Sequence, residues 1–377
     1  MEYASVSEGM KQLFPGYVTP VPEHKTDKNV LILLHSLIPG GAQVAALEIV
    51  PLLQQNGFQP WVLSYDGGEF REQFTENRIP CGILAEHRME EGLKEFFLSA
   101  FDLVILNSIA SFPFADCFIN TSLPVIWWIH ETEQFLRKVS ESSIFQNKVS
   151  DNFHFAGAAL KAQEGIKNVF CKEATLLPLP VADLRNRFHG EERPCIRFLL
   201  PARFEPIKGQ DLLLQAVDRL PPEYVEKSEF ILCGLTMPED QKYESVIRDY
   251  ASKLQNVKIM GNVTREALYQ MYASCDCVVA PSRMDLNPLS VIEGMMFEKL
   301  TIASSAAGIS GHMTDCVNGF VFPSENSEEL FKRLLLIIAD STKLKPVATA
   351  GRQLYEQYFS PEVSQKCLAG LLKRLIH

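Results

Sequence analysis

The sequence has no run of about eighteen uncharged apolar residues, the length that a membrane-spanning helix requires. Its first thirty residues contain three glutamates and three prolines, which is not the pattern of a secretory signal peptide. We therefore expect a cytoplasmic protein without a transmembrane segment.

A sustained stripe of lysine and arginine is also missing. The chain has 36 basic and 46 acidic residues and a formal net charge of -10. This balance argues against nucleic acid as a partner, because nothing would neutralise a phosphate backbone. It also disfavours broad attachment to anionic lipid, although Lys366, Lys373 and Arg374 leave room for a peripheral membrane contact.

Cysteines in the spacing of a zinc site are absent as well. The nine cysteines are scattered, and Cys275 and Cys277 surround a predicted strand, where core packing explains them better than metal binding. We expect no metal and no cofactor. An odd number of cysteines fits a reducing cytoplasm.

What the chain does have is a regular alternation of short apolar segments and amphipathic segments. At 377 residues it is long enough for two domains, and its 46% hydrophobic content is typical of a globular enzyme. The alternation predicts an α/β protein with parallel sheets. In the first half we expect strands near residues 30–35, 60–64, 81–84, 102–106, 124–129, 153–156 and 174–177, with helices such as 42–56 and 90–99 between them.

The proline-rich stretch at residues 177–183 is the best candidate for a linker. We therefore place a first domain at 29–185 and a second, with its own strand and helix series, at 186–341. Helical sequence at 342–377 closes the chain. Residues 1–28 show no clear period, and we interpret them as an appended arm.

The most informative segment is residues 281–293, which follow a predicted strand at 276–280. Pro288 suits the first turn of a helix, because its missing N–H would have no partner there. The open N–H groups of Leu289, Ser290 and Val291 would then point back at the end of the strand. Such groups can bind a diphosphate without a basic side chain.

Two carboxylates eight positions apart lie on either side of this helix start. Asp285 is on the loop, and Glu293 is about one turn into the helix, where it can accept hydrogen bonds from a sugar hydroxyl. A structural alternative is that Asp285 caps the helix and that Glu293 is merely solvated.

Two cations five positions apart follow another predicted strand, which begins at residue 196. Arg203 and Lys208 lie on the loop that leads into the next helix. An arginine that binds bidentately and a lysine that acts as a point charge suit a diphosphate. Two surface cations without a ligand remain the alternative.

Two features of the first half also lie at strand ends. Gly40 and Gly41 form a turn after the first strand, where residues without side chains let the backbone come close to a ligand. His130 ends the apolar strand near 124–129, and open α/β sheets bind ligands at such carboxyl ends. An ordinary turn and a structural histidine are the alternatives.

In combination these motifs resemble the retaining glycosyltransferases of family 4. Arg203 and Lys208 are similar to that family's Arg-x4-Lys-Gly element, and Asp285 and Glu293 to its acid-x7-acid signature. His130 is similar to its His-Asp or His-Glu element. The chain has Asp285 where glutamate is commoner in that family, and the shorter side chain moves the carboxylate oxygens by roughly one C–C bond.

The resemblance implies the GT-B fold, with two Rossmann-like doubly wound parallel-sheet domains facing across a cleft. It implies that the last helix packs back on the first domain. It also implies that Gly40 and Gly41 lie beside the donor phosphates, that Glu293 binds the nucleotide ribose, and that Asp285 and His130 face the transferred sugar.

The implied function is metal-independent retaining transfer of a sugar from a nucleotide-sugar donor to an acceptor hydroxyl. The acceptor would be a glycan, a lipid-linked molecule or a protein, as in the assembly of polysaccharides and glycoconjugates. Two alternatives stay open: a non-catalytic binding or partner subunit with the same fold, and a nucleotide-sugar epimerase.

Overall fold

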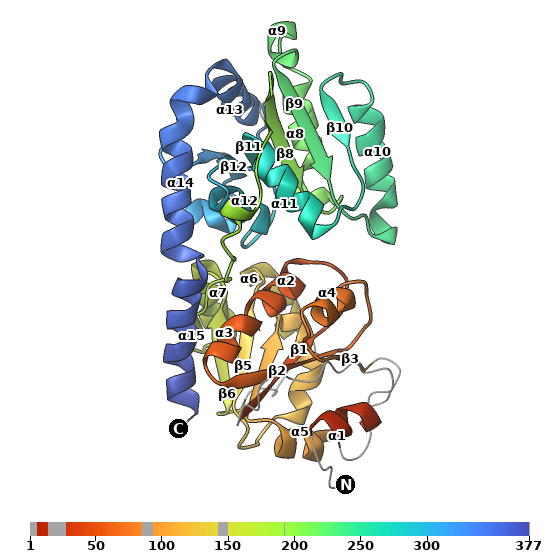
Figure 1. Cartoon of the computed structure of the whole chain (residues 1–377), viewed down its shortest axis with the longest axis vertical. Coiled ribbons are helices and arrows are strands. Elements are labelled where there is room, and N and C mark those ends of the chain that lie inside the picture. The colour runs from red at the N-terminus through yellow and green to blue at the C-terminus, as the bar shows by residue number, and fades with distance from the viewer. Residues whose placement is uncertain (1–5, 14–27, 85–92, 142–149, 192, 377) are drawn as a thin grey trace. The chain divides into compact units, whose positions relative to one another are not determined.

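The computed structural model describes residues 6–13, 28–84, 93–141, 150–191 and 193–376 (Figure 1). The chain forms two compact units. The first comprises Met1–Pro180 and Pro361–His377, and the second comprises Val181–Ser360. The change of unit after Pro180 falls within the proline-rich stretch, whereas the sequence suggested a domain boundary at residue 185.

The first unit contains a sheet of seven parallel strands. Its strands are β1 (Lys28–Leu34), β2 (Phe58–Ser64), β3 (Cys81–Ile83), β4 (Leu103–Asn107), β5 (Val125–Ile129), β6 (Phe153–Gly157) and β7 (Ala174–Leu176). All seven lie within two residues of the predicted segments. Because the central strands are buried along their length, they read as continuous apolar runs.

Helices connect these strands. They are α2 (Gly41–Glu48), α3 (Val50–Gln55), α4 (Arg71–Glu76), α5 (Leu93–Ala100), the 3₁₀ segment η1 (Ile109–Cys117), α6 (Glu133–Ser140) and α7 (Leu160–Phe170). The single helix expected at 42–56 is two helices that meet at Ile49, because Pro51 has no N–H to continue the hydrogen-bond ladder. The helix expected at 90–99 begins at Leu93 in the described part of the chain, and residues 90–92 lie outside it.

The two ends of the chain belong to this first unit. Helix α1 (Val6–Leu13) lies in the predicted arm and contacts α5, and its Met10 is fully buried. The blue helix α15 (Pro361–Leu375) contacts α3 and β7 (Figure 1). The Ser364 hydroxyl donates to the Pro178 carbonyl over 3.0 Å.

The second unit contains six parallel strands. They are β8 (Ile196–Pro201), β9 (Ser228–Cys233), β10 (Val257–Ile259), β11 (Cys277–Ala280), β12 (Leu300–Ser304) and β13 (Phe320–Phe322). Its helices are η2 (Arg185–Arg187), η3 (Pro206–Lys208), α8 (Gln210–Val217), α9 (Pro222–Val225), η4 (Pro238–Asp240), α10 (Gln241–Ala251), α11 (Arg265–Ser274), α12 (Leu289–Met296), η5 (Gly308–Gly311), α13 (Ser327–Ala339), η6 (Ser341–Leu344) and α14 (Lys345–Tyr358).

Both faces of the second sheet are covered by helices. Phe198 and Leu200 of β8 point into a core shared with α8, α10 and α13. Leu199 between them points into the opposite core, shared with α11, α12 and α14. This alternation shows a doubly wound sheet, since successive side chains of a strand point to opposite faces.

The two sheets have the same strand order. The first runs β3-β2-β1-β4-β5-β6-β7, and the second runs β10-β9-β8-β11-β12-β13. In each, the direction of winding reverses between the first strand of the unit and the fourth, that is, between β1 and β4 and between β8 and β11. Open α/β sheets bind ligands at the carboxyl ends of the strands at such a switch point. The loops that follow these four strands are therefore the expected places for a ligand.

Within the described residues, no helix has the length and apolar character needed to cross a membrane.

Candidate active site

The two motifs of the second unit meet at its switch point. Lys208 ends η3 on the loop after β8, and Asp285 lies on the loop between β11 and α12. The Lys208 Nζ atom donates to Asp285 Oδ2 over 2.6 Å, and the two side chains are 22% and 13% exposed. Residues that are 77 positions apart thus form one partly buried ion pair, which remains open to a ligand from solvent.

Arg283 connects these two loops through hydrogen bonds. Its backbone N–H donates to the Ile207 carbonyl over 2.7 Å, and its guanidinium donates to the Pro206 carbonyl over 2.6 Å. The guanidinium also binds both oxygens of Asp211 at 2.8 and 2.6 Å. Because a bidentate arginine fixes both distance and orientation, the position of Lys208 relative to Asp285 is determined by the protein before any ligand binds.

Glycines let the loops come close enough for these contacts. Gly209 has a φ of 71°, and a Cβ at this position would lie 2.1 Å from the Pro281 carbonyl oxygen. Gly308 donates its N–H to the Asp285 carbonyl over 2.8 Å, and a Cβ there would lie 1.8 Å from the Leu286 carbonyl oxygen. The Lys-Gly element and the glycine loop after β12 therefore both hold the segment that carries Asp285.

Arg203 lies on the loop after β8, next to this pair. Its guanidinium contacts Glu205 at 3.1 Å, and its side chain is 41% exposed. Within the described residues it forms no hydrogen bond or ion pair with Lys208 or Asp285. Its exposed guanidinium can turn toward an anion at the carboxyl edge of the sheet.

Helix α12 presents its first N–H groups at the same edge. The helix begins at Leu289, and Pro288 is its N-cap rather than a residue of the first turn. The Val291 N–H, which we expected to be open, donates to the Pro288 carbonyl over 3.0 Å. The N–H groups of Leu289 and Ser290 have no partner among the described residues.

Glu293 is buried, so the idea that it is merely solvated is wrong. It is 2% exposed, and its Oε1 accepts from the Arg265 guanidinium over 2.8 Å. The Tyr272 hydroxyl also bonds to Glu293, and burial followed by this carboxylate raises the pKa of Tyr272 well above its usual range. Arg265 in turn lies over the ring of Tyr269, 4.7 Å from its centre. The contact between Glu293 and the ribose remains a prediction. The structure shows in addition that Arg265 binds this carboxylate.

In the first unit, His130 and Asn107 lie together at the ends of β5 and β4. The His130 Nε2 atom is 2.9 Å from Asn107 Oδ1. Asn107 also donates from Nδ2 to the Ala42 carbonyl over 2.8 Å. Because Ala42 follows Gly40 and Gly41, this amide connects the glycine turn to His130.

Glu131 organises the backbone around the same edge. Its carboxylate accepts from the Ser108 hydroxyl, from the Ile109 N–H over 3.1 Å and from the His130 N–H over 3.0 Å. Ser108 has a φ of 84°, a strained conformation for a residue other than glycine. Burial raises the pKa of Glu131 even though these hydrogen bonds lower it. We interpret Glu131 as the group that maintains this turn.

The two histidines at this edge are held in the neutral form. Burial, followed by repulsion from His35, lowers the pKa of His130 to about 3. Burial also lowers the pKa of His35, against the opposing effect of Asp66. The His35 Nδ1 atom is buried and has no hydrogen-bond partner in the part of the chain that the structure describes. The first unit thus offers neutral polar groups where the second offers cations.

The family models match both units. The model described as glycosyl transferases group 1 matches residues 186–354, and the model described as glycosyl-transferase family 4 matches residues 26–151. The chain belongs to the group 1 glycosyltransferases.

Curated relatives resemble parts of this group 1 chain. An uncharacterized glycosyltransferase of Methanocaldococcus jannaschii is 25% identical over 177 residues, which is 46% of this chain and 46% of the relative. A glycogen synthase of Haemophilus influenzae is 23% identical over 205 residues, which is 52% of this chain and 42% of the relative. The chain therefore spans less than half the length of these relatives.

Solved structures resemble nearly the whole chain. The structure of Anabaena HepE in complex with UDP has a TM-score of 0.77 and 18% identity, covering 92% of this chain and 100% of that one. Sucrose-phosphate synthase of Thermosynechococcus elongatus has a TM-score of 0.72 and 16% identity, covering 92% and 99%. At these identities the similarity shows the fold, which is GT-B.

Three residues of these sites were missed at the sequence level. Asn107 ends a strand that the sequence did predict, so the rule of strand ends could have found it. Arg283 lies inside the acidic segment, between the predicted strand and Asp285. No sequence pattern predicts the role of Arg265, because nothing local indicates that a residue at a helix start pairs with a carboxylate 28 positions later.

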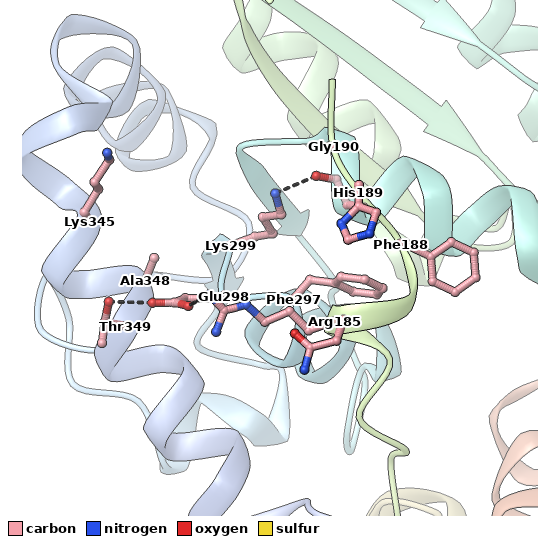
Figure 2. Close-up of a pocket in the computed structure, with 12 residues that line it drawn as sticks. Arg185, Phe188, His189, Gly190, Phe297, Glu298, Lys299, Lys345, Ala348 and Thr349 are labelled. Carbon is pink, nitrogen blue, oxygen red and sulfur yellow. Dashed lines mark hydrogen bonds and ion pairs between the residues drawn. The ribbon is translucent and has the colours of Figure 1, made fainter. Parts of the chain in front are cut away.

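The second unit also contains a pocket of about 750 Å³, and Figure 2 shows residues that line it. It lies where β11 and β12 begin, so it is at the amino edge of the sheet, whereas Lys208 and Asp285 lie at the carboxyl edge. Arg185 pairs with Glu298 there, and Lys299 donates to the Ala273 carbonyl over 2.7 Å. This pocket is separate from the candidate active site.

Replacing Gly209 by alanine should destabilise the second unit. The new Cβ would meet the Pro281 carbonyl and would require a left-handed backbone, so we expect a loss of more than about 2 kcal/mol in the free energy of unfolding. Gly261→Ala is the matched control, because a Cβ at Gly261 would meet nothing within 4 Å. Urea denaturation measures both variants, and equal losses would contradict the role given to Gly209.

His130 should make the folded state less stable in acid. An unfolded histidine binds a proton below its ordinary pKa of 6.5, whereas folded His130 stays neutral down to about 3. Stability should therefore fall as pH drops below about 6.5, by at most about 1.4 kcal/mol per pH unit from this group. Comparing urea denaturation at pH 7 and pH 5, His130→Asn should show a smaller loss than the unmodified protein. His189→Asn, at an exposed position, should not; the same loss in all three proteins would refute the prediction.

Proposed function

We propose that this protein is a glycosyltransferase that moves a sugar from a nucleoside diphosphate to an acceptor hydroxyl, with retention of the anomeric configuration. The observation that carries the proposal is the Lys208–Asp285 pair at the switch point between β8 and β11. A cation beside a carboxylate at this edge can hold a phosphate and a sugar hydroxyl side by side. Membership of the group 1 family supports the same reaction class.

The second unit would bind the diphosphate. Lys208 and Arg203 supply positive charge, and the open N–H groups of Leu289 and Ser290 supply donors at the positive end of the helix dipole. These groups would stabilise the negative charge that grows on the leaving phosphate as the glycosidic bond breaks. The proposed reaction requires no resident metal, because these groups can neutralise the diphosphate.

The nucleoside would be bound by Glu293. Its carboxylate is fixed by Arg265 and Tyr272, so it is oriented before the ligand arrives and could share its oxygens with ribose hydroxyls. We propose uridine as the first base to test, because Anabaena HepE has been solved with UDP and with UDP-glucose.

In the proposed reaction, the bond between the anomeric carbon and the phosphate oxygen breaks. The acceptor oxygen forms its new bond on the same face of the sugar, and its proton passes to the leaving phosphate. No side-chain nucleophile is needed. Asp285, held by Lys208 and Arg283, would orient the sugar, and neutral His130 would bind a substrate hydroxyl. The acceptor class is a glycan, a lipid-linked molecule or a protein.

Lys208→Ala should abolish transfer and leave the protein folded. A contact worth about 4 kcal/mol in the transition state corresponds to a loss of about three orders of magnitude in rate. The measurement is release of nucleoside diphosphate with a panel of UDP-sugars, with circular dichroism as the check of folding.

Lys253→Ala is the matched control for this variant. Lys253 pairs with Asp249 at 2.8 Å, as Lys208 pairs with Asp285, but both members of this pair are largely exposed, and Lys253 lies just beyond the end of α10. Its loss should leave the rate unchanged. If both variants retain full turnover, Lys208 has no part in the reaction.

UDP should stabilise the protein, and a chelator should not reverse the effect. At about a hundredfold excess over its dissociation constant, a ligand that binds only the folded state adds about 2.7 kcal/mol to the free energy of unfolding. Thermal unfolding with UDP, GDP and ADP, each with and without EDTA, measures base preference and metal dependence together. A shift that EDTA removes would contradict metal-independent binding, and the absence of any shift would contradict the donor site.

A further inference from the structure

Asn107 occupies a position that determines how its amide must point. It is fully buried at the end of β4, beside the switch point of the first sheet. One end of the amide faces the Ala42 carbonyl oxygen at 2.8 Å, and the other faces His130 Nε2 at 2.9 Å. A carbonyl oxygen can only accept a hydrogen bond, so the amide nitrogen must be the end that faces Ala42. The amide oxygen therefore faces His130.

This orientation determines which nitrogen of His130 carries the proton. An amide oxygen only accepts, so Nε2 must be the donor in the contact with Asn107. A neutral imidazole has one N–H, so the Nδ1 atom then has a free lone pair. Among the described residues, no hydrogen bond engages Nδ1.

We propose that Asn107 is a positioning residue that fixes His130 as the Nε2–H tautomer, so that Nδ1 accepts a hydrogen bond from a substrate hydroxyl. The substrate part of this inference rests on the proposed function, and the tautomer part does not. Phosphate oxygens, which only accept hydrogen bonds at neutral pH, would be repelled by a lone pair at Nδ1. His130 would therefore select a hydroxyl group rather than the diphosphate.

The surrounding groups support a neutral imidazole with a fixed ring. Glu131 accepts from the His130 backbone N–H, which holds the residue at the strand end without pairing with its ring. The Trp128 ring lies 4.5 Å from the His130 ring, centre to centre. His35 is the other titratable group that acts on this ring, and its charge would oppose protonation of His130.

The same amide connects His130 to the glycine turn. Because Asn107 donates to Ala42, a movement of Gly40 and Gly41 would change the amide that holds the imidazole. Gln43 gives the turn a second attachment, donating from its buried side chain to the Ser36 carbonyl over 2.9 Å. Hydrogen bonds thus connect the His130 imidazole to the glycine turn at the carboxyl edge of β1, β4 and β5.

Nitrogen-15 NMR of the histidine-labelled full chain at pH 7 tests the tautomer directly. The His130 resonances are assigned by their absence in His130→Gln. We expect a protonated Nε2 and an unprotonated Nδ1 in the unmodified protein. An Nδ1–H tautomer or a doubly protonated ring would overturn the proposal, whether or not the protein shows transfer.

The Asn107→Asp variant provides a second test of the proposal. A carboxylate beside Nε2 should favour the imidazolium, in which Nδ1 becomes a donor, and the NMR spectrum at pH 7 should show both nitrogens protonated. We expect kcat/KM for transfer to fall at least tenfold, while the thermal shift with UDP stays within error of that of the unmodified protein. Unchanged His130 resonances and unchanged kcat/KM in Asn107→Asp would refute the positioning role.

These two tests distinguish a failure of this inference from a failure of the proposed function. If no UDP-sugar supports transfer by the unmodified protein, the proposed function fails, and the spectrum of that same protein still decides the tautomer. If transfer occurs but His130 carries its proton on Nδ1, the proposed function stands and the role of Asn107 is refuted.

Discussion

The ion pair between Lys208 and Asp285 is the interaction on which the second unit's site depends. Removing two charges from water costs free energy, which a partly buried pair recovers only with good geometry and further hydrogen bonds. Here the geometry comes from the backbone: Arg283 joins the two loops, and Gly209 and Gly308 permit their close approach. We therefore interpret the pair as an interaction that holds a cation and a carboxylate next to each other at the switch point, rather than as a source of stability.

Sequence alone predicted the parts of the fold that local pattern determines. Buried parallel strands are continuous apolar runs, so β1 to β7 could be located to within a few residues, and the loops carrying Lys208 and Asp285 followed from strand ends. The helix expected at 42–56 is divided in two, because the apolar pattern continues through Pro51 although proline has no N–H for the helical hydrogen bonds. Helix α1 was missed because its buried Met10 depends on contact with α5, which no local sequence pattern shows.

Side-chain partners were harder to predict than positions. Glu293 was placed correctly on a helix, but its burial depends on Arg265 and Tyr272, which come from another helix. Asn107 contacts both Ala42 and His130 because three strand ends lie at one edge of a sheet. The spacing of these residues in the sequence does not predict how close they lie in the fold. Strand order, which only the folded structure gives, decides which loops become neighbours.

The two units use one topology for opposite chemistry. At its switch point the second sheet gathers Lys208, Arg203 and the open end of α12, which suit a ligand of high negative charge. The first sheet gathers His35, Asn107 and His130, of which the two histidines are kept neutral by burial. These neutral side chains have no electrostatic attraction for a diphosphate, and their donors and acceptors match hydroxyl groups instead. In the proposed reaction, the second sheet would bind the phosphorylated part of the donor and the first sheet would bind hydroxyl groups. One fold can serve both purposes, because the choice of ligand depends on the few side chains at the strand ends.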